Sequence, residues 1–246
     1  MERMKERIIV KNVSKMFNVG FRKHRSLFDR TLLFLSGQTS KKLVWVIKKV
    51  SFSAKEGEMV GLVGKNGSGK STLLRMIARI YNKEGGIIKT RGKICPLIGL
   101  GVGMQERLTM KDNIYLCGAL FGLTRQEIDQ KFNPIVEFSE LENFVNTKIY
   151  QFSSGMKQRL AFSIAIHSNP EILLIDEVFA VGDENFRRKS TERIKELVEK
   201  GATVLLVSHD IELIEKHCDR AILLDSGQVL KDGSIREVIK EYLKLK

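Results

Sequence analysis

The segment with the clearest chemistry is GKNGSGKS, residues 64–71, which matches the phosphate-loop pattern G-x-x-x-x-G-K-[ST] at every fixed position. Glycines let backbone N–H groups turn toward a β-phosphate, the lysine reaches the β and γ oxygens, and the serine hydroxyl can bind Mg²⁺. The alternative is a glycine-rich turn without a ligand, which the complete match disfavours. We therefore predict a triphosphate site made by Gly64, Lys65, Asn66, Gly67, Ser68, Gly69, Lys70, Ser71 and Thr72.

Two neighbouring acids, Asp176 and Glu177, follow the apolar run ILLI and would complete such a site. Asp176 ends the run where a carboxylate would hold Mg²⁺, and adjacent side chains at a strand end point in different directions. We therefore predict that Asp176, together with Ser71, binds the metal, and that Glu177 accepts a proton from the attacking water. The alternative is a pair of solvated acids that cap the strand.

His209 lies after another apolar run, in the segment LLVSHD. A lone histidine is more often structural than catalytic. However, side chains that follow parallel strands meet at the carboxyl edge of the sheet, where the γ-phosphate would lie. We therefore include His209 with Lys70 and Glu177 as candidate catalytic residues.

The elements that must position these residues are visible as apolar patterns. Segments 42–52 and 58–64 are rich in β-branched residues and predict strands, whereas residues 70–81 have the apolar spacing of a helix. Segments 171–177 and 202–210 are almost wholly apolar before their polar ends, which is typical of buried parallel strands. The phosphate loop and the acids would thus lie at the carboxyl edge of one α/β sheet.

Two further patterns complete the predicted architecture. Residues 125–150 are helical and polar enough to form a separate small lobe. Residues 221–233 predict a hairpin that turns at Ser226 and Gly227. The closing helix, residues 234–246, would begin with a capping box formed by Ser234 and Glu237.

A second candidate anion site begins at QFSSGMKQR, residues 151–159. Ser153, Ser154 and Gly155 open what reads as a helix, and the first N–H groups of a helix lack internal partners and attract anions. One chain therefore carries two candidate phosphate sites, residues 64–72 and residues 153–155, which we call the two phosphate cups.

Together these motifs resemble the ABC ATPase family, the nucleotide-binding domains of ABC transporters. FSSGM, residues 152–156, stands where that family has its LSGGQ signature, and Ser153 and Gly155 match it. The resemblance implies one nucleotide-binding domain over residues 1–246, of P-loop α/β type: a RecA-like mixed sheet core, an antiparallel β subdomain and a small helical subdomain at about residues 105–168. It also implies that each ATP is enclosed between residues 64–72 of one copy and residues 153–155 of another, which would explain the two cups.

The resemblance extends to isolated residues. Asp183, in AVGD, matches the D-loop aspartate, and His209 matches the switch histidine. Phe17 is the candidate for the aromatic side chain that stacks on adenine, with Trp45 as a substitute, unless both are core residues. The glutamine loop of the family would place its glutamine near Leu100, and Gln105, several residues later, is the available candidate.

Particular strings, among them GLGVG and LTMKDNIYL, are similar to the ATP-binding subunits of bacterial O-antigen and teichoic acid exporters. This similarity implies a homodimer at the cytoplasmic face of the inner membrane, paired with two membrane permease subunits, that moves an undecaprenyl-diphosphate-linked polysaccharide. A teichoic acid or a capsular polysaccharide is the alternative cargo. Some relatives carry a C-terminal carbohydrate-binding domain, and a chain ending at Lys246 is expected to lack one.

An insertion at residues 17–45 separates this sequence from a minimal domain of the family. Its apolar residues alternate with cations and would suit an amphipathic helix at a membrane surface. In the exporter family the insertion forms a gate helix, which would bring a lipid diphosphate to Arg22, Lys23, Arg25 and Arg30. The alternative is a helix packed on its own domain.

Charge and composition narrow the remaining alternatives. The formal net charge is +13, and residues 1–60 hold 14 Lys or Arg against 5 Asp or Glu, which suits an anionic partner. A nucleic-acid-associated ABC ATPase would be expected to show paired domains or long coiled coils, so we predict no nucleic-acid partner. An importer or drug exporter subunit would share the catalytic chemistry and differ only in its partner.

We expect Cys95, Cys117 and Cys218 to be buried thiols, and no apolar run reaches the length of a membrane span.

Overall fold

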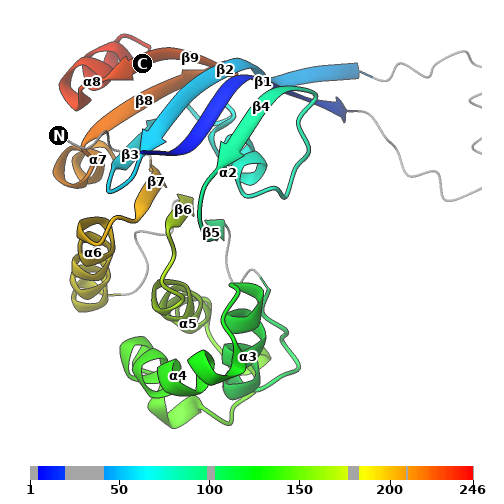
Figure 1. The fold of residues 1–246 in the computed structure, drawn as a ribbon, viewed down its shortest axis with the longest axis vertical. Helices are drawn as coiled ribbons and strands as arrows, with labels where there is room; N and C mark the ends of the chain where they lie inside the picture. The colour runs from blue at the N-terminus through cyan, green and yellow to red at the C-terminus, as the bar shows by residue number, and fades with distance from the viewer. Residues whose placement is uncertain (1–4, 20–41, 99–102, 177–182, 209, 246) are drawn as a thin grey trace, which may run out of the picture.

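The computed structural model describes residues 5–19, 42–98, 103–176, 183–208 and 210–245 (Figure 1). The strands are β1 (Glu6–Val19), β2 (Lys42–Lys55), β3 (Met59–Val63), β4 (Gly85–Thr90), β5 (Ile94–Ile98), β6 (Ile172–Asp176), β7 (Thr203–Val207), β8 (Arg220–Asp225) and β9 (Gln228–Gly233). The helices are α2 (Lys70–Ile77), α3 (Met110–Leu120), α4 (Arg125–Ser139), α5 (Ser154–His167), α6 (Glu184–Glu199), α7 (Ile211–His217) and α8 (Ile235–Lys244). Short 3-10 turns lie at Glu142–Phe144 and Ile149–Gln151.

The central sheet has six strands in the order β5-β6-β7-β3-β8-β9. The first five are parallel, and β9 is antiparallel to β8. Strands β3 and β7 are buried along their whole length, because both faces of the sheet are covered. Apolar residues of α5, α6, α7 and α8 pack against one face. Helix α2 and the second sheet cover the other.

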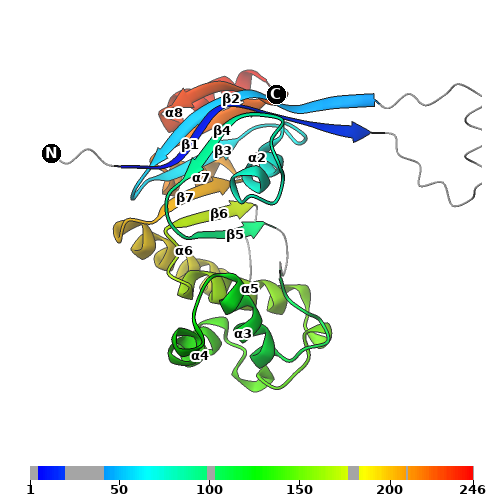
Figure 2. The same ribbon diagram turned by 45° about the vertical axis from the view of Figure 1, so that its right-hand side comes forward.

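The second sheet has the order β2-β1-β4 and is antiparallel. Its inward residues, among them Ile8, Val10 and Ile47, are fully or almost fully buried against the central sheet. The pairing of β1 with β2 continues to Val19 and Lys42, so these two strands extend beyond the sheet as a ribbon (Figure 2).

Helices α3, α4 and α5 pack around an apolar cluster of their own, which includes Met110, Ile135 and Leu160. This helical part lies at the opposite end of the molecule from the three-stranded sheet (Figures 1 and 2). Helices α3 and α4 each begin with a complete capping box, Thr109 with Asp112 and Thr124 with Glu127. The helical part therefore has local start signals and its own core.

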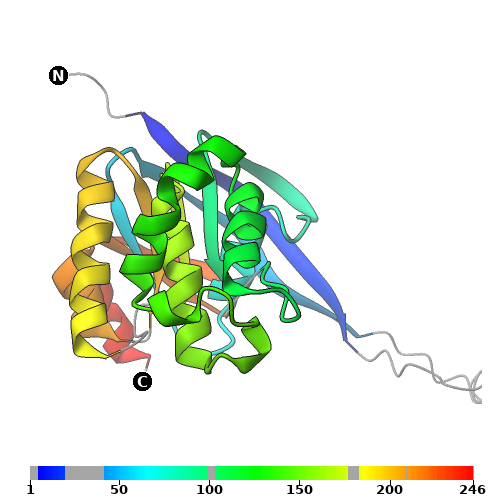
Figure 3. The same cartoon turned by 90° about the horizontal axis from the view of Figure 1, so that it is seen from below.

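Helix α5 joins the helical part to the central sheet. Leu160 and Ile164 belong to the helical cluster, whereas Phe162, Ala165 and Ile166 belong to the core under the central sheet. Seen from below, the green helices of the helical part lie beside yellow α6 (Figure 3). A helix that is apolar on two sides is buried between two layers, and residues 160–166 of α5 are consequently held by both.

Most of the element predictions are confirmed. The hairpin turns at Ser226 and Gly227, with φ of 46° and 80°, the left-handed pair that a tight turn requires. The predicted helix over residues 70–81 is shorter than expected and ends at Ile77, because Arg79 takes a left-handed φ of 61°. The α/β class with a mixed central sheet and an antiparallel β subdomain is confirmed.

The predicted capping box at the last helix is wrong. Ser234 is the N-cap residue of α8, but its side chain makes no capping hydrogen bond. Glu237 instead forms an ion pair with Lys231 of β9, with 3.3 Å between Nζ and Oε2. A neighbouring lysine has therefore replaced the local partner that the sequence pattern offered.

The three cysteines are free and buried, as expected. Burial raises the pKa of the Cys95 and Cys218 thiols to about 12 and that of Cys117 to about 11. Within the part of the chain that the structure describes, no helix is both long and apolar enough to cross a membrane.

Candidate functional site

The loop between β3 and α2 is shaped by glycines. A Cβ at Gly64 would lie 2.1 Å from the carbonyl oxygen of Leu224, and a Cβ at Gly69 would lie 2.7 Å from Cδ1 of Ile47. Gly69 also has a φ of 107°, which an L side chain rarely adopts. Glycine at these positions is therefore required by backbone shape and close packing.

Helix α2 begins without a side-chain cap. Gly69 is its N-cap residue and has no side chain to accept a hydrogen bond, so no capping oxygen competes for the first N–H groups of the helix. In addition, the buried hydroxyl of Ser68 has no hydrogen-bond partner among the described residues. N–H groups without a side-chain cap and an unpaired buried hydroxyl at a helix start fit a phosphate group.

Lys70 is buried at the start of α2. Its ammonium donates hydrogen bonds to the carbonyl oxygens of Gly64 at 2.7 Å and Lys65 at 2.9 Å. The loop thus folds around the lysine, which places a positive charge inside the cup that its own backbone forms.

Ser71 and Asp176 meet although they are far apart in the sequence. The Ser71 hydroxyl donates to a carboxylate oxygen of Asp176 at 3.1 Å, so the first turn of α2 touches the end of β6. A hydroxyl and a carboxylate are oxygen ligands of the kind that Mg²⁺ prefers, and Mg²⁺ sites commonly use few protein ligands alongside phosphates and water. No group of three or more His, Cys, Asp or Glu side chains that could hold a metal occurs among the described residues. The donor set therefore fits Mg²⁺ bound together with a phosphate.

These residues line one cavity of about 740 Å³, which we call the phosphate cavity. Its walls comprise Asn66, Gly67, Gly69, Lys70, Ser71, Thr72 and Asp176, with Val46 and Arg75 at the side. This volume is in the range of small-molecule sites. Most of the predicted phosphate loop and the predicted metal-binding acid thus line one cavity, whereas residues 153–155 do not contribute to it.

The second cup is an exposed helix tip. Ser153 is the N-cap residue of α5, and its hydroxyl accepts a hydrogen bond from the Met156 N–H at 3.2 Å. Ser153 and Ser154 are exposed, and a Cβ at Gly155 would meet only the Ser153 hydroxyl, at 3.8 Å. The preceding Phe152 is buried in the helical cluster and fixes the base of the tip. The tip is thus open toward the outside of the chain.

Asp183 is the N-cap residue of α6. One carboxylate oxygen accepts from the Phe186 N–H at 2.9 Å, and the other accepts from a guanidinium nitrogen of Arg159 at 2.6 Å. The Phe186 N–H, with the charge of Arg159, holds the pKa of Asp183 below its ordinary value of 3.8. Asp183 is therefore a structural cap as well as a predicted D-loop residue.

Gln105 is exposed, and its backbone is anchored. Its N–H donates to the Asn113 side chain at 2.7 Å, and its carbonyl accepts from the same amide at 3.1 Å. Asn113 is fully buried in α3 and was not singled out by the sequence. An amide in the middle of an otherwise apolar helical face was the available signal, since such a group needs partners when buried.

The geometry separates Phe17 from Trp45. Phe17 pairs across the ribbon with Val44, and Val46, two residues along the same strand, lines the phosphate cavity. Phe17 and Val44 are a cross-strand pair and share one face of the ribbon, whereas Trp45, the neighbour of Val44, lies on the other. Trp45 is 48% exposed. Of the two aromatics, Phe17 is the one that contacts Tyr81, whose ring lies beside the cavity-lining Arg75.

The sequence reasoning missed Tyr81, a neighbour of Phe17, and Arg75, a neighbour of Tyr81. The Tyr81 ring stands edge-on to Phe17, with 5.5 Å between ring centres. The Arg75 guanidinium lies 5.9 Å from the centre of the Tyr81 ring and also lines the cavity. A tyrosine one turn beyond a helix that starts at the phosphate loop was the usable signal.

Several predicted site residues lie outside the described residues. These are Glu177, His209, Leu100, and the insertion cations Arg22, Lys23, Arg25 and Arg30. Their neighbours are placed: Asp176 ends β6, and Asp210 caps α7 and donates its N–H to the Ser208 hydroxyl at 3.0 Å.

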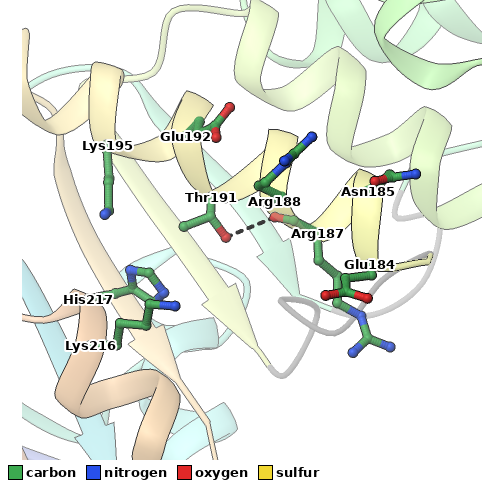
Figure 4. Close-up of a pocket in the computed structure, with 9 residues that line it drawn as sticks. All are labelled: Glu184, Asn185, Arg187, Arg188, Thr191, Glu192, Lys195, Lys216 and His217. Carbon is green, nitrogen blue, oxygen red and sulfur yellow. Dashed lines mark hydrogen bonds between the residues drawn. The ribbon is translucent and has the colours of Figure 1, made fainter.

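A second cavity, of about 450 Å³, lies between α6 and α7 (Figure 4). Its lining mixes both charge signs, with Glu184 and Glu192 beside Arg188, Lys195 and Lys216. Burial, together with Lys195 and Lys216, lowers the pKa of His217. None of the predicted site residues lines this cavity, and it has no glycine loop, so the phosphate cavity remains the candidate site.

Comparison with known proteins gives a consistent result. A family model described as ABC transporter matches residues 47–180. The O-antigen export system ATP-binding protein RfbB of Myxococcus xanthus is 38% identical over 240 residues, covering 96% of this chain and 55% of the relative. The RfbB protein of Klebsiella pneumoniae is 40% identical, with 80% of each chain covered. The teichoic acids export ATP-binding protein TagH of Lactococcus lactis is 42% identical, covering 85% of this chain and 45% of the relative.

The chain therefore spans about half the length of some of these relatives and most of the length of others. Among solved structures, an ATP-binding subunit of an ABC transporter has a TM-score of 0.77 at 26% identity, covering 96% of this chain and 92% of the other. A dimeric ATP-binding cassette in a post-hydrolysis state, bound to ADP and Pi, has a TM-score of 0.75 at 26% identity, covering 93% and 99%. These matches confirm the predicted P-loop fold of ABC type, and the chain belongs to the ABC transporter family.

Proposed function

We propose that this chain is the ATP-hydrolysing subunit of an exporter that moves a lipid-linked polysaccharide across the bacterial inner membrane. The observation that carries the ATPase part is the meeting of Ser71 with Asp176 inside the cavity that the glycine loop and Lys70 form. A glycine loop, a buried lysine and a hydroxyl–carboxylate pair are the parts that a nucleoside triphosphate with Mg²⁺ requires.

In this proposal the loop residues 64–72 bind the phosphates of ATP, and Lys70 balances the charge of the β and γ oxygens. Ser71 and Asp176 would hold Mg²⁺, which when bound neutralises part of the phosphate charge. Glu177 removes the proton from the attacking water, and His209 lies near the γ-phosphate. Phe17 stacks on adenine, which its contact with Tyr81, beside the cavity-lining Arg75, supports. Gln105 stays the candidate for the glutamine loop.

The two cups in one chain support a shared site. Residues 153–155 are exposed and do not line the phosphate cavity of their own chain. We therefore assign Ser153, Ser154, Gly155 and Asp183 to the ATP held by a second copy, in a homodimer. The dimeric cassette with a similar fold supports this arrangement. ATP would then be a ligand of the closed pair, and hydrolysis would favour its opening.

The export part of the proposal is supported by the relatives, which are named as O-antigen and teichoic acid export ATP-binding proteins. We propose two membrane permease partners and a position at the cytoplasmic face of the membrane. The cargo is an undecaprenyl-diphosphate-linked polysaccharide of O-antigen type, with a teichoic acid or capsular polymer as the alternative. Residues 17–45 would be the insertion that meets the lipid diphosphate, and residues 105–168 the helical subdomain.

One pair of variants tests the ATPase part. Glu177→Gln removes the proton acceptor and leaves Lys70 and Asp176 in place, so we expect ATP binding with a turnover about 10²- to 10⁴-fold lower and an ATP-trapped dimer. Lys70→Ala should fail earlier, with an ATP affinity about 10- to 100-fold lower, because a charged hydrogen bond is lost. Phosphate release and size-exclusion chromatography with MgATP measure both. Full turnover by Glu177→Gln would exclude it as the base.

A second pair tests the export part in cells that also contain the permease. Neutralising Arg22, Lys23, Arg25 and Arg30 should reduce export of the polymer more than it reduces ATP hydrolysis. The matched control neutralises four exposed cations of α6, α7 and α8, namely Lys195, Lys216, Arg236 and Lys240, and should change neither. Equal loss of export and hydrolysis in the insertion variant would mean that the insertion is only structural.

A further inference from the structure

Three helices meet at one guanidinium. Arg159 of α5 donates a hydrogen bond from one terminal nitrogen to Glu140, at 2.7 Å, and from the other to Asp183, at 2.6 Å. The second carboxylate oxygen of Glu140 accepts from the Lys189 ammonium of α6 at 3.0 Å. We call this set, Arg159, Glu140, Asp183 and Lys189, the Arg159 clamp.

The clamp is not an ordinary surface ion pair. The Arg159 side chain is 18% exposed, and its guanidinium lies 4.8 Å from the centre of the ring of Phe186, which is fully buried. The Lys189 ammonium lies 4.4 Å from the centre of the Phe138 ring. Exposed pairs contribute little, but a guanidinium that uses two nitrogens and its planar face together is held in one orientation.

The position of each clamp residue on its helix gives the clamp its meaning. Glu140 is the C-cap residue of α4 and has a left-handed φ of 58°, so its place depends on the end of that helix. Asp183 is the N-cap residue of α6, and both of its oxygens are occupied, one by Phe186 and one by Arg159. Arg159 lies one helical turn beyond Gly155 and therefore on the same side of α5.

We propose that Arg159 is a positioning residue that fixes the start of α5 (residues 153–155) and Asp183, the N-cap residue of α6, relative to each other. One copy of the chain then presents both to the ATP of its partner as one unit. This inference rests on the proposed function, because it assumes that the tip acts on a second copy. Arg159 would contact neither ATP nor the water that attacks it. Its effect would appear in the partner's site and not in the phosphate loop of its own chain.

That directionality permits a mixing experiment with full-length chains that all carry Glu177→Gln, so that closed dimers trap ATP. The parent dimer should trap two ATP, because a twofold pair has two equivalent sites. Arg159→Ala should trap at least about tenfold less, and Lys70→Ala likewise. When the two variants are mixed, one site contains an intact loop and an intact Arg159, so the mixed dimer should trap one ATP. If Arg159 supported its own loop, mixing would restore nothing.

Three controls make the outcome decisive. Ser153→Ala mixed with Lys70→Ala tests the shared site itself: if that pair also traps nothing, the proposed function fails, whereas if only the Arg159 pair fails, this inference alone is overturned. Arg193→Ala removes another half-buried arginine, paired with Glu196 on α6, and should trap as the parent does. Arg159→Lys keeps the charge and loses the fork, so it should trap an intermediate amount and replaces Arg159→Ala if that variant does not fold. Parent-like trapping by a folded Arg159→Ala would refute the proposal.

Discussion

The two candidate phosphate sites, residues 64–72 and 153–155, both lie at helix starts, yet they are built by different means. At residues 64–72 the backbone passes so close to its neighbours that only glycine fits at positions 64 and 69, where there is no room for a Cβ. At residues 153–155 the backbone is in open space, and side chains hold it: Ser153 caps the helix, Phe152 anchors it and Arg159 ties it to two other helices.

This difference indicates which of the two candidate sites has the charged groups for a triphosphate within a single chain. The loop encloses Lys70 and touches Asp176, so the charges that a triphosphate needs are already in one chain. The α5 tip offers a capped helix start, and Lys157 in the first turn of this helix is paired with Glu106 at 2.6 Å. The loop at residues 64–72 thus carries its own charges, whereas the tip at residues 153–155 is a helix start held in place by side chains, as a surface that completes a partner's site would need to be.

The largest expected difference lies between two glycines. Gly69→Ala would require a left-handed alanine and a 2.7 Å contact, so we expect a loss of stability of about 1–3 kcal/mol and impaired ATP binding. Gly155→Ala meets no neighbour closer than 3.8 Å and should keep or slightly raise the stability, by up to about 1 kcal/mol, since alanine favours a helix.

Urea unfolding measures both glycine variants, and ATP trapping in the Glu177→Gln background measures the second cup. Gly155→Ala should lose trapping while remaining folded, because a methyl group would occupy the open tip. Equal destabilisation by the two variants would break the comparison between a backbone-shaped cup and a side-chain-shaped cup.

A smaller effect separates two N-cap serines. Ser153→Ala removes the hydrogen bond to the Met156 N–H and should lower the free energy of unfolding by about 0.5–2 kcal/mol. Ser234→Ala is the matched control, since that exposed serine makes no capping bond at α8, and should stay within about 0.5 kcal/mol of the parent. Thermal or urea unfolding would show the difference, and equal costs would mean that the Ser153 bond does not hold the tip.

The smallest effect is a dependence on acid pH. Hydrogen bonds from Thr109, from Thr124 and from the Phe186 N–H lower the pKa values of Asp112, Glu127 and Asp183 respectively. Because the folded pKa values are depressed, the stabilisation is complete above the ordinary values near 4 and is lost as the pH falls through the lowered ones. Residues 64–72 contain no acid.

Hydrogen exchange, corrected for intrinsic rates, should therefore rise in α3, α4 and the start of α6 between pH 5 and pH 3 before it rises in β3 and α2. Simultaneous loosening of both regions would show that the charged caps do not set the stability of the helical part.

The sequence alone was sufficient for the glycine loop before α2, the buried strands and the fold class. In each case the determinants are contiguous: the loop pattern lies within eight residues, and the apolar runs of β3, β6 and β7 report burial on both faces. It failed for the capping box at Ser234, where Lys231 from a neighbouring strand captured Glu237.

Which aromatic contacts Tyr81, why Asn113 is buried, and that Arg159 joins Glu140 to Asp183 were decided only by the tertiary structure. The reason is physical. A backbone conformation or a strand pattern is set by neighbours along the chain, whereas the partner of a long side chain depends on which helices pack side by side. The shape of the loop at residues 64–72 is therefore set by residues that are adjacent in the sequence. The orientation of the helix start at residues 153–155 is set only when helices α4, α5 and α6 pack together.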